Sequence, residues 1–323
     1  MIACRDVSFS YPASGPVDGE CLTEGALKHI TCTIEDGSFV LLCGASGCGK
    51  TTLTRLLNGL IPHYHEGTFT GSVYLGGKDT RDLSLFEISQ MVGSVFQNPR
   101  SQFFNVDTTS ELAFGPENHG LPEKAVRERV RLVAEQLRLE SLLDRSIFSL
   151  SGGEKTRVNL ARLILEDTDI LLLDEPINGL DPEGIVEFRN LLLRLNQERQ
   201  TTILISSHIL SELANLATCY GFLDNGMMLE QISARALEEK CRACIEARVD
   251  DASRAALVLE QSLGIRDYEV LPGHLLRIYS SLDAPHRVAQ ALVEGGVALQ
   301  SIESRGANLE DYFLSMIGGV RHA

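Results

Sequence analysis

Residues 44–51 read GASGCGKT and match G-x-x-x-x-G-K-[ST], a pattern typical of loops that wrap nucleotide phosphates. Its glycines let backbone N–H groups approach phosphate oxygens that a Cβ would hold away. Lys50 supplies a positive charge to the outer phosphates, and the Thr51 hydroxyl can bind Mg²⁺. The predicted ATP-binding residues of this loop are Gly44, Ala45, Ser46, Gly47, Cys48, Gly49, Lys50, Thr51 and Thr52.

The sequence on either side of the loop supports nucleotide binding over a chance match. The apolar run at 39–43, FVLLC, predicts a buried strand that leads into the loop. TTLTRLLNGL at 51–60 predicts a helix that leaves the loop and ends near Gly59 and Pro62. The N-terminus of such a helix directs its partial positive charge at the phosphates.

Length and composition indicate a soluble protein of about two domains. The 323 residues are 44% hydrophobic and 23% charged, which is ordinary for a globular chain. No segment approaches the roughly 20 apolar residues that cross a bilayer, and the N-terminal sequence lacks the pattern of a secretory signal. We therefore expect a cytoplasmic protein, for which any membrane span would come from other chains.

Net charge and cysteine content narrow the functional classes to which the protein can belong. The formal net charge of −15 disfavours a nucleic-acid partner, because neutralising phosphates requires clustered Lys and Arg. The eight cysteines are expected to be reduced thiols. Cys241 and Cys244 form a C-x-x-C, but no second Cys or His pair follows at zinc spacing. This favours two incidental thiols over a metal or redox site.

Predicted strands and helices alternate up to about residue 235. Residues 2–11 alternate in the manner of an edge strand, and 26–44 predict two strands joined by a turn at Asp36-Gly37. Residues 70–80 predict a hairpin with Gly76-Gly77 at its tip. Further strands are predicted at 91–97, 170–174 and 201–208, and further helices from Leu121, after the glycine turn at 148–154, and from Asp181-Pro182.

After residue 235 the pattern changes to a small β-α-β-β-α-β unit, followed by an amphipathic helix at 308–318. No nucleotide or catalytic motif occurs in this part of the sequence. We therefore expect an α/β P-loop NTPase domain at 1–235 and a small α+β accessory domain at 236–323.

A second glycine turn, LSGGE at 150–154, opens a predicted helix ahead of the run ILLLDE at 170–175. One chain cannot readily fold this turn onto its own phosphate loop, whereas two chains arranged head to tail can. Together with 44–51, these motifs resemble the ATP-binding cassette (ABC) superfamily over residues 1 to about 230. The resemblance implies an ABC-type nucleotide-binding domain with a helical subdomain at about 97–165.

The resemblance also implies a role for each motif residue. Tyr11 resembles the aromatic that stacks on adenine, and Asp174 the carboxylate associated with Mg²⁺. Glu175 resembles the base that polarises water, Gln97 the glutamine that touches Mg²⁺ and attacking water, and His208 the switch histidine on the γ-phosphate. The implied catalytic residues are thus Glu175, His208 and Gln97, and the implied metal ligands are Thr51, Gln97 and Asp174. The residues implied to cap ATP held by the opposite subunit are Leu150, Ser151, Gly152, Gly153, Glu154 and Asp181.

Each of these residues also has an ordinary structural interpretation. Tyr11 could be a strand-end aromatic, Gln97 a loop amide, and His208 a structural histidine. The acidic pair Asp174-Glu175 is harder to explain structurally, because buried acids are costly unless they are used. Acids directly after a buried strand lie where a doubly wound sheet presents its ligands.

Different parts of the chain resemble different branches of the superfamily. Residues 1 to about 150 resemble energy-coupling-factor importers, in FSYP, LNGLIPHYHEGTFTGSV and VFQNPRSQFFNVDTTSELAFGPEN. The piece LSGGEKTRVNLARLILEDTDILLLDEP resembles the translation-factor branch. From about Gly179, the phrases GLDPEGIVEFRNLLLRLN, ILISSHILSEL and GANLEDYFLSMIGG resemble bacitracin and multidrug exporter ATPases.

The helical subdomain is the part on which membrane subunits of this superfamily dock, and here it is importer-like. The resemblance therefore implies a homo- or heterodimeric ATPase on the inner face of the cell membrane, using Mg²⁺ and driving integral membrane subunits of energy-coupling-factor type. A drug or peptide exporter is the alternative. A soluble translation factor is the second alternative, which a single cassette, net acidity and GLD at 179–181 disfavour. The cargo and the direction of transport stay open.

Overall fold

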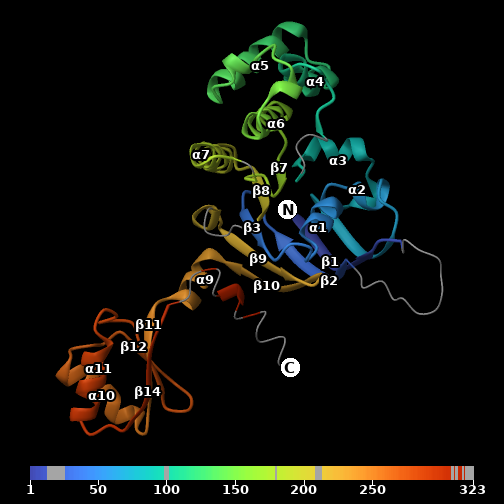
Figure 1. The fold of residues 1–323 in the computed structure, drawn as a ribbon. Helices are drawn as coiled ribbons and strands as arrows, with labels where there is room; N and C mark the ends of the chain where they lie inside the picture. Colours follow the sequence, from blue (N-terminus) through green and yellow to red (C-terminus); the bar gives the residue numbers. More distant parts are fainter. Residues whose placement is uncertain are drawn as a thin grey trace. The chain divides into compact units, whose positions relative to one another are not determined.

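The computed structural model describes residues 1–12, 26–97, 102–178, 180–207, 213–306, 309, 312–314 and 316 (Figure 1). The chain divides into two compact units, Met1–Ala234 and Arg235–Ala323. Within the described ranges, no helix has the length and apolar character required to cross a membrane.

A six-stranded sheet forms the centre of the first unit. Its strands, in spatial order, are β10 (Met227–Ser233), β9 (Cys219–Asp224), β3 (Phe39–Cys43), β8 (Thr202–Ser207), β7 (Ile170–Asp174) and β6 (Val92–Val95). Neighbouring strands from β9 to β6 are parallel, and β10 is antiparallel to β9. Every residue of β3, β7 and β8 is buried, as expected for parallel strands covered on both faces. The predicted buried strands at 39–43 and 170–174 are confirmed, whereas the strand predicted at 91–97 already ends at Val95.

A second, antiparallel sheet has the order β2 (Leu27–Ile34), β1 (Ile2–Ser10), β4 (Thr68–Leu75) and β5 (Lys78–Asp79). The hairpin with Gly76-Gly77 at its tip is confirmed, and both glycines have positive φ. The prediction of β1 as an edge strand is wrong, because β1 pairs with β2 on one side and with β4 on the other. Its alternating pattern reflects a sheet with one face on the core, which interior antiparallel strands share with edge strands.

The turn at Asp36-Gly37 joins two strands, as predicted, but these strands belong to different sheets. β2 is part of the antiparallel sheet, and β3 is part of the six-stranded sheet. Both sheets contribute to one apolar core, in which Phe9 and Ile30 of the antiparallel sheet join Leu42 and Leu204 of the six-stranded sheet. The turn is therefore the point where the chain crosses between the two layers.

The helices of the first unit are α1 (Lys50–Leu57), α2 (Leu60–His63), α3 (Leu85–Met91), α4 (Thr108–Asn118), α5 (Glu123–Gln136), α6 (Gly152–Glu166) and α7 (Pro182–Arg199). Short 3-10 turns span Thr80–Asp82, Glu140–Leu142, Ile147–Ser149 and Ala214–Leu216. α4 and α5 pack against α6, and Figure 1 shows these three helices grouped at one end of the unit. The helix after the phosphate loop ends before Gly59 as predicted, and Pro62 lies in the next helix, α2.

The second unit has the predicted order β-α-β-β-α-β. It comprises α9 (Ala234–Cys241), which begins at the boundary, then β11 (Cys244–Val249), α10 (Ala252–Ser262), β12 (Tyr268–Leu271), β13 (Leu275–Ile278), α11 (Pro285–Glu294) and β14 (Leu299–Arg305). Its sheet has the order β12-β13-β11-β14, and one apolar core joins α10 and α11 to the sheet. The helix predicted at 308–318 lies mostly outside the described residues.

Candidate nucleotide site

The loop between β3 and α1 has a backbone conformation that requires glycine at several positions. Gly47 and Gly49 adopt φ values of 80° and 111°, which disfavour L side chains. A Cβ on Gly44 would meet the Cys48 sulfur and the carbonyl oxygen of Leu223, each at 2.5 Å. Gly49 is the N-cap residue of α1, so the N-terminus of this helix opens at the loop.

Lys50 is held inside this loop. Its side chain is only 5% exposed, and Nζ donates to the carbonyl oxygens of Gly44 at 2.8 Å and Ala45 at 3.1 Å. The same nitrogen lies 3.4 Å from Oε1 of Glu175, whose side chain is 7% exposed. The ammonium is therefore desolvated and surrounded by oxygen atoms, the surroundings that suit a phosphate-binding cation.

Parallel pairing brings the acidic pair to the same edge of the sheet. Cys43 pairs with Ser207 and Asp174 with Ser206, so the carboxyl ends of β3, β8 and β7 lie side by side. Asp174 accepts a hydrogen bond from the Thr51 hydroxyl, with Oγ1 and Oδ2 2.7 Å apart. Two sequence motifs that are 123 residues apart thus meet in one cluster.

Ser206 is a site residue that the sequence reasoning missed. Its hydroxyl donates to Oδ1 of Asp174 at 2.6 Å. The backbone N–H of Glu175 donates to both the hydroxyl and the carbonyl oxygen of Ser206, each at 3.1 Å. Glu175 has a φ of 50°, a left-handed conformation that a non-glycine residue adopts at a cost. The only signal for Ser206 is that two serines follow the apolar run at 203–205 at the end of the strand.

The residues present fit a magnesium ion. Thr51 and Asp174 offer a hydroxyl and a carboxylate oxygen close together, and Mg²⁺ prefers hard oxygen ligands. Among the described residues, no three His, Cys, Asp or Glu side chains are grouped for a metal. Mg²⁺ does not require such a group, because it takes one or two protein ligands and completes its shell with phosphate and water.

Tyr11 lies beside the helix that follows the phosphate loop. Its hydroxyl accepts a hydrogen bond from Nη1 of Arg55 at 3.0 Å and lies 3.4 Å from the Thr52 hydroxyl. Its ring packs edge-on against Phe9, with centroids 4.8 Å apart. The half-buried ring is therefore fixed at one side of the loop, and Arg55 is a second residue that the sequence reasoning did not name.

The glycine turn at 150–154 lies apart from the phosphate loop on the first unit. Ser151 is the N-cap of α6, where its hydroxyl accepts the N–H of Glu154 and its own N–H donates to Glu154 Oε2 at 2.7 Å. Asp181 caps α7 in the same way by accepting the N–H of Gly184 at 2.9 Å. Leu150 is buried beneath this turn. Ser151, Gly152, Gly153, Glu154 and Asp181 line one open hollow of about 540 Å³, and no residue of 44–52 lines it.

The other predicted site residues are Gln97, His208 and Cys48, and the structure describes no contact that joins them to the cluster of Thr51 and Asp174. Gln97 is exposed, two residues beyond the end of β6. His208 lies outside the described residues, directly after β8. Cys48 is buried, and this burial raises the pKa of its thiol, with nearby Lys50 acting in the opposite direction.

The fold and this cluster define a P-loop nucleoside triphosphatase. The family model described as ABC transporter matches residues 27–178. The bacitracin transport ATP-binding protein BcrA of Bacillus licheniformis is 34% identical over 299 residues, which are 92% of this chain and 94% of BcrA. A Treponema denticola protein assigned to the ABC transporter ATP-binding proteins is 41% identical over 247 residues, 76% of this chain and 49% of that protein. The chain thus spans about half the length of that relative.

Solved structures show the same fold. CbiO1 from Clostridium perfringens, part of the ABC transporter complex CbiONQ, has a TM-score of 0.61 and 26% identity, covering 74% of this chain and 90% of CbiO1. The dimeric bacterial ABC transporter cassette MJ0796 has a TM-score of 0.63 and 24% identity, covering 73% and 99% of the two chains. The chain therefore belongs to the family of ABC transporter ATP-binding proteins.

Proposed function

We propose that this chain binds MgATP at residues 44–52 and hydrolyses it as one half of a head-to-tail dimer, and that hydrolysis drives a separate membrane subunit. The observation that carries this proposal is one cluster that brings the buried side chains of Lys50, Asp174 and Glu175 together with the half-buried Thr51. Phosphoryl transfer depends on positioning and charge neutralisation more than on covalent chemistry, and this cluster supplies both.

Each member of the cluster has a distinct task. The loop N–H groups and the N-terminus of α1 hold the phosphates, and Lys50 exchanges its present oxygen partners for phosphate oxygens. Thr51 and Asp174 would hold Mg²⁺, which neutralises charge on the phosphates when bound. Ser206 fixes the orientation of Asp174 and the backbone of Glu175. The Glu175 carboxylate then orients and polarises the attacking water.

The hollow formed by Ser151, Gly152, Gly153 and Asp181 is the second half of the site. It carries two capped helix N-termini, and helix N-termini favour anions. Because this hollow is separate from residues 44–52, we assign it to the ATP held by a partner chain in a homo- or heterodimer. Tyr11 would stack on adenine, and Gln97 and His208 would complete the contacts at the γ-phosphate.

We propose that exposed apolar residues of the helical subdomain, at about 97–165, contact the membrane partner. Phe104 and Phe148 are 75% and 81% exposed, and Val106 is exposed as well. Phe104 stacks on Phe114 of α4, with ring centroids 5.4 Å apart. Apolar side chains grouped on a surface are typical of protein–protein contacts. Residues 97–150 have the importer-like sequence, so we propose an energy-coupling-factor-type partner and a position on the inner face of the membrane.

An exporter ATPase is the second candidate. It is favoured by BcrA, because the similarity to BcrA covers 92% of this chain and so extends into the second unit. The two candidates differ in the membrane protein that they bind. Affinity purification of the tagged chain from membranes of its source, followed by mass spectrometry, supports the importer if a transmembrane coupling subunit is recovered. Recovery of a six-span exporter subunit would contradict it.

The central experiment on hydrolysis compares the wild type with Glu175→Gln. The amide keeps the shape of the carboxylate but cannot act as a base, so phosphate release from MgATP should fall by about 10²-fold or more. Calorimetric binding of MgATP should persist. Glu198→Gln, which changes an exposed acid of α7, is the matched control and should hydrolyse ATP as the wild type does. Wild-type hydrolysis by Glu175→Gln would overturn the assignment.

A further inference from the structure

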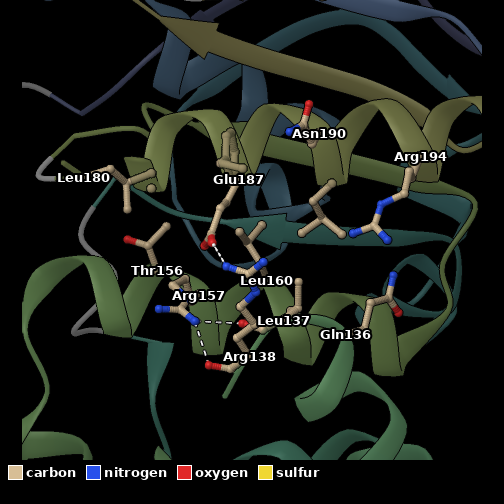
Figure 2. Close-up of a pocket in the computed structure, with 13 residues that line it drawn as sticks. Gln136, Leu137, Arg138, Thr156, Arg157, Leu160, Leu180, Glu187, Asn190 and Arg194 are labelled. Atoms are coloured by element: carbon tan, nitrogen blue, oxygen red, sulfur yellow. Dashed lines mark hydrogen bonds and ion pairs between the residues drawn. The ribbon is translucent and has the colours of Figure 1, made fainter. Parts of the chain in front are cut away.

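We propose that the groove between α6 and α7, which the C-terminal end of α5 also lines, binds a small carboxylate with an apolar body (Figure 2). The groove has a volume of about 300 Å³. This is at the lower end of the range of about 300–1,000 Å³ found for small-molecule sites. It is a different place from the phosphate loop, since no residue of 44–52 lines it.

The floor and walls of the groove are apolar. Leu160 of α6 and Phe188 and Leu191 of α7 are buried residues that reach it, and Leu137 at the end of α5 is half-buried. Burying an apolar ligand surface here would favour binding in proportion to the area removed from water. The ligand therefore needs a compact hydrocarbon or aromatic body.

Three arginines surround this apolar floor in a chain with a net charge of −15. Two of them are already engaged. Arg157 donates to the carbonyl oxygens of Leu137 and Arg138, at 2.8 and 2.7 Å. Arg138 pairs with Glu187, with Nη1 and Oε1 3.2 Å apart. These two arginines hold the end of α5 against α6 and α7.

Arg194 is the third arginine, and it is the one available to a ligand. Among the interactions of the described residues, it has no hydrogen bond or ion pair. Figure 2 shows Arg194 and Glu187 both extending from α7 over the groove, with Gln136 facing the Arg194 end. Among the described residues, the only carboxylate that lines the groove belongs to Glu187, which is paired with Arg138. The Arg194 end thus offers a guanidinium and amide donors, which match one carboxylate.

The geometry also limits what else the groove could bind. A guanidinium accepts a carboxylate through two parallel N–H···O bonds, so a planar monoanion suits a single arginine. A nucleotide polyphosphate would need several cations and a glycine loop, which are found at 44–51 instead. A stable protein partner would need about 800 Å² on this chain, far more than a groove of this size provides.

Such a ligand would lie between two helices that begin at the proposed second half of the ATP site. α6 begins after Ser151 and α7 after Asp181, and Leu180 and Gly184 line both the groove and the hollow. An occupant would fix the spacing of α6 and α7. Because the hollow is formed at the N-termini of these helices, its width would be fixed as well. This consequence rests on the proposed function, whereas binding to the groove does not.

The test uses 3-phenylpropionate as the probe and 3-phenylpropanol as its uncharged counterpart. Each is titrated into the full chain with isotope-labelled leucine methyl groups, and binding is followed by NMR. We expect the carboxylate to shift the methyl signals of Leu137, Leu160 and Leu191 with a millimolar dissociation constant. The methyl signals of Leu276, in the core of the second unit, should not move. The alcohol should bind about tenfold more weakly.

Arg194→Met removes the charge and keeps the apolar stem of an exposed side chain. It should reduce carboxylate affinity about tenfold, to that of the alcohol, and leave alcohol binding unchanged. Arg127→Met changes an exposed arginine of α5 that does not line the groove, and it should bind both probes as the wild type does. Unchanged leucine signals, equal affinities for the two probes, or wild-type carboxylate affinity in Arg194→Met would each overturn the proposal.

Discussion

The ammonium of Lys50 lies 3.4 Å from Oε1 of Glu175, and both side chains are nearly fully buried. Removing one partner of a buried ion pair is costly because it leaves the other charge uncompensated. A bound phosphate would take the place of Glu175 as the partner of Lys50. The residue proposed to activate water is thus also the counter-ion of the residue proposed to bind phosphate.

Glu175→Gln should therefore lower the stability of the nucleotide-free chain. Since Lys50 keeps its bonds to two carbonyl oxygens, we expect a loss of about 1–3 kcal/mol. MgATP should restore more stability to this variant than to the wild type, because phosphate replaces the missing charge. Thermal unfolding with and without MgATP measures both effects. Equal melting temperatures of the two proteins without nucleotide would show that the pair contributes little.

Ser206→Ala should impair both acidic residues of the cluster. It removes the donor to Oδ1 of Asp174 and one acceptor of the Glu175 N–H, which leaves a buried carboxylate oxygen with one partner fewer. We expect a loss of about 1–3 kcal/mol in unfolding free energy, together with reduced ATP turnover. Ser89→Ala is the control, because this exposed hydroxyl donates only to a backbone carbonyl. Wild-type stability and turnover in Ser206→Ala would remove Ser206 from the site.

Arg162→Met should destabilise the helical region. Arg162 and Glu111 are 9% and 0% exposed, with Nη1 and Oε1 3.0 Å apart. Glu111 also accepts the N–H groups of Phe104 and Asn105, so it holds the segment that carries the exposed Phe104. An unpaired buried carboxylate should reduce unfolding free energy by about 3–5 kcal/mol. The double variant Arg162→Met, Glu111→Gln should regain part of this loss in urea titrations, and its failure to do so would argue against the ion pair as the cause.

The turn at 150–154 should weaken in acid. The backbone N–H of Ser151 chiefly, with the Ser151 hydroxyl and Arg145, holds the pKa of Glu154 below its ordinary value of 4.5. A carboxyl with a lowered pKa in the folded state stabilises the fold above its unfolded pKa and loses this effect as the pH falls through its folded pKa. The melting temperature of the wild type should exceed that of Glu154→Gln at pH 7, and the difference should shrink below about pH 4.5. A difference that stays constant down to pH 3 would contradict this assignment.

The parts that were predictable from sequence are those that local patterns determine. GASGCGKT requires positive φ at Gly47 and Gly49, and these glycines have it. The run before Asp174 is apolar because β7 is buried on both faces. Ser151 and Asp181 precede helices and cap them with their side chains. In each case the physical cause lies within a few residues of the pattern.

The parts that were missed depend on contacts between distant segments. β1 alternates as an edge strand would, and only its pairing with β4 makes it an interior strand. Ser206 is one serine among many until parallel pairing places it beside Asp174. Arg162 and Glu111 meet although they are 51 residues apart. No local pattern shows such meetings, because pairing and helix packing determine them.

The most direct measurement of the central claim, a composite ATP site shared by two chains, is the molar mass with MgATP by light scattering. Glu175→Gln, which cannot turn over ATP, should form a dimer when MgATP is added. Adding Ser151→Arg to this variant places a long cation in the turn that should meet the phosphate of the partner's ATP, so the double variant should bind MgATP normally yet stay monomeric. Adding Ser89→Arg, at an exposed serine of α3, should leave dimerisation intact. If the chain with Ser151→Arg dimerises as readily as Glu175→Gln alone, residues 150–154 are only a helix cap, and the account of a shared site is wrong.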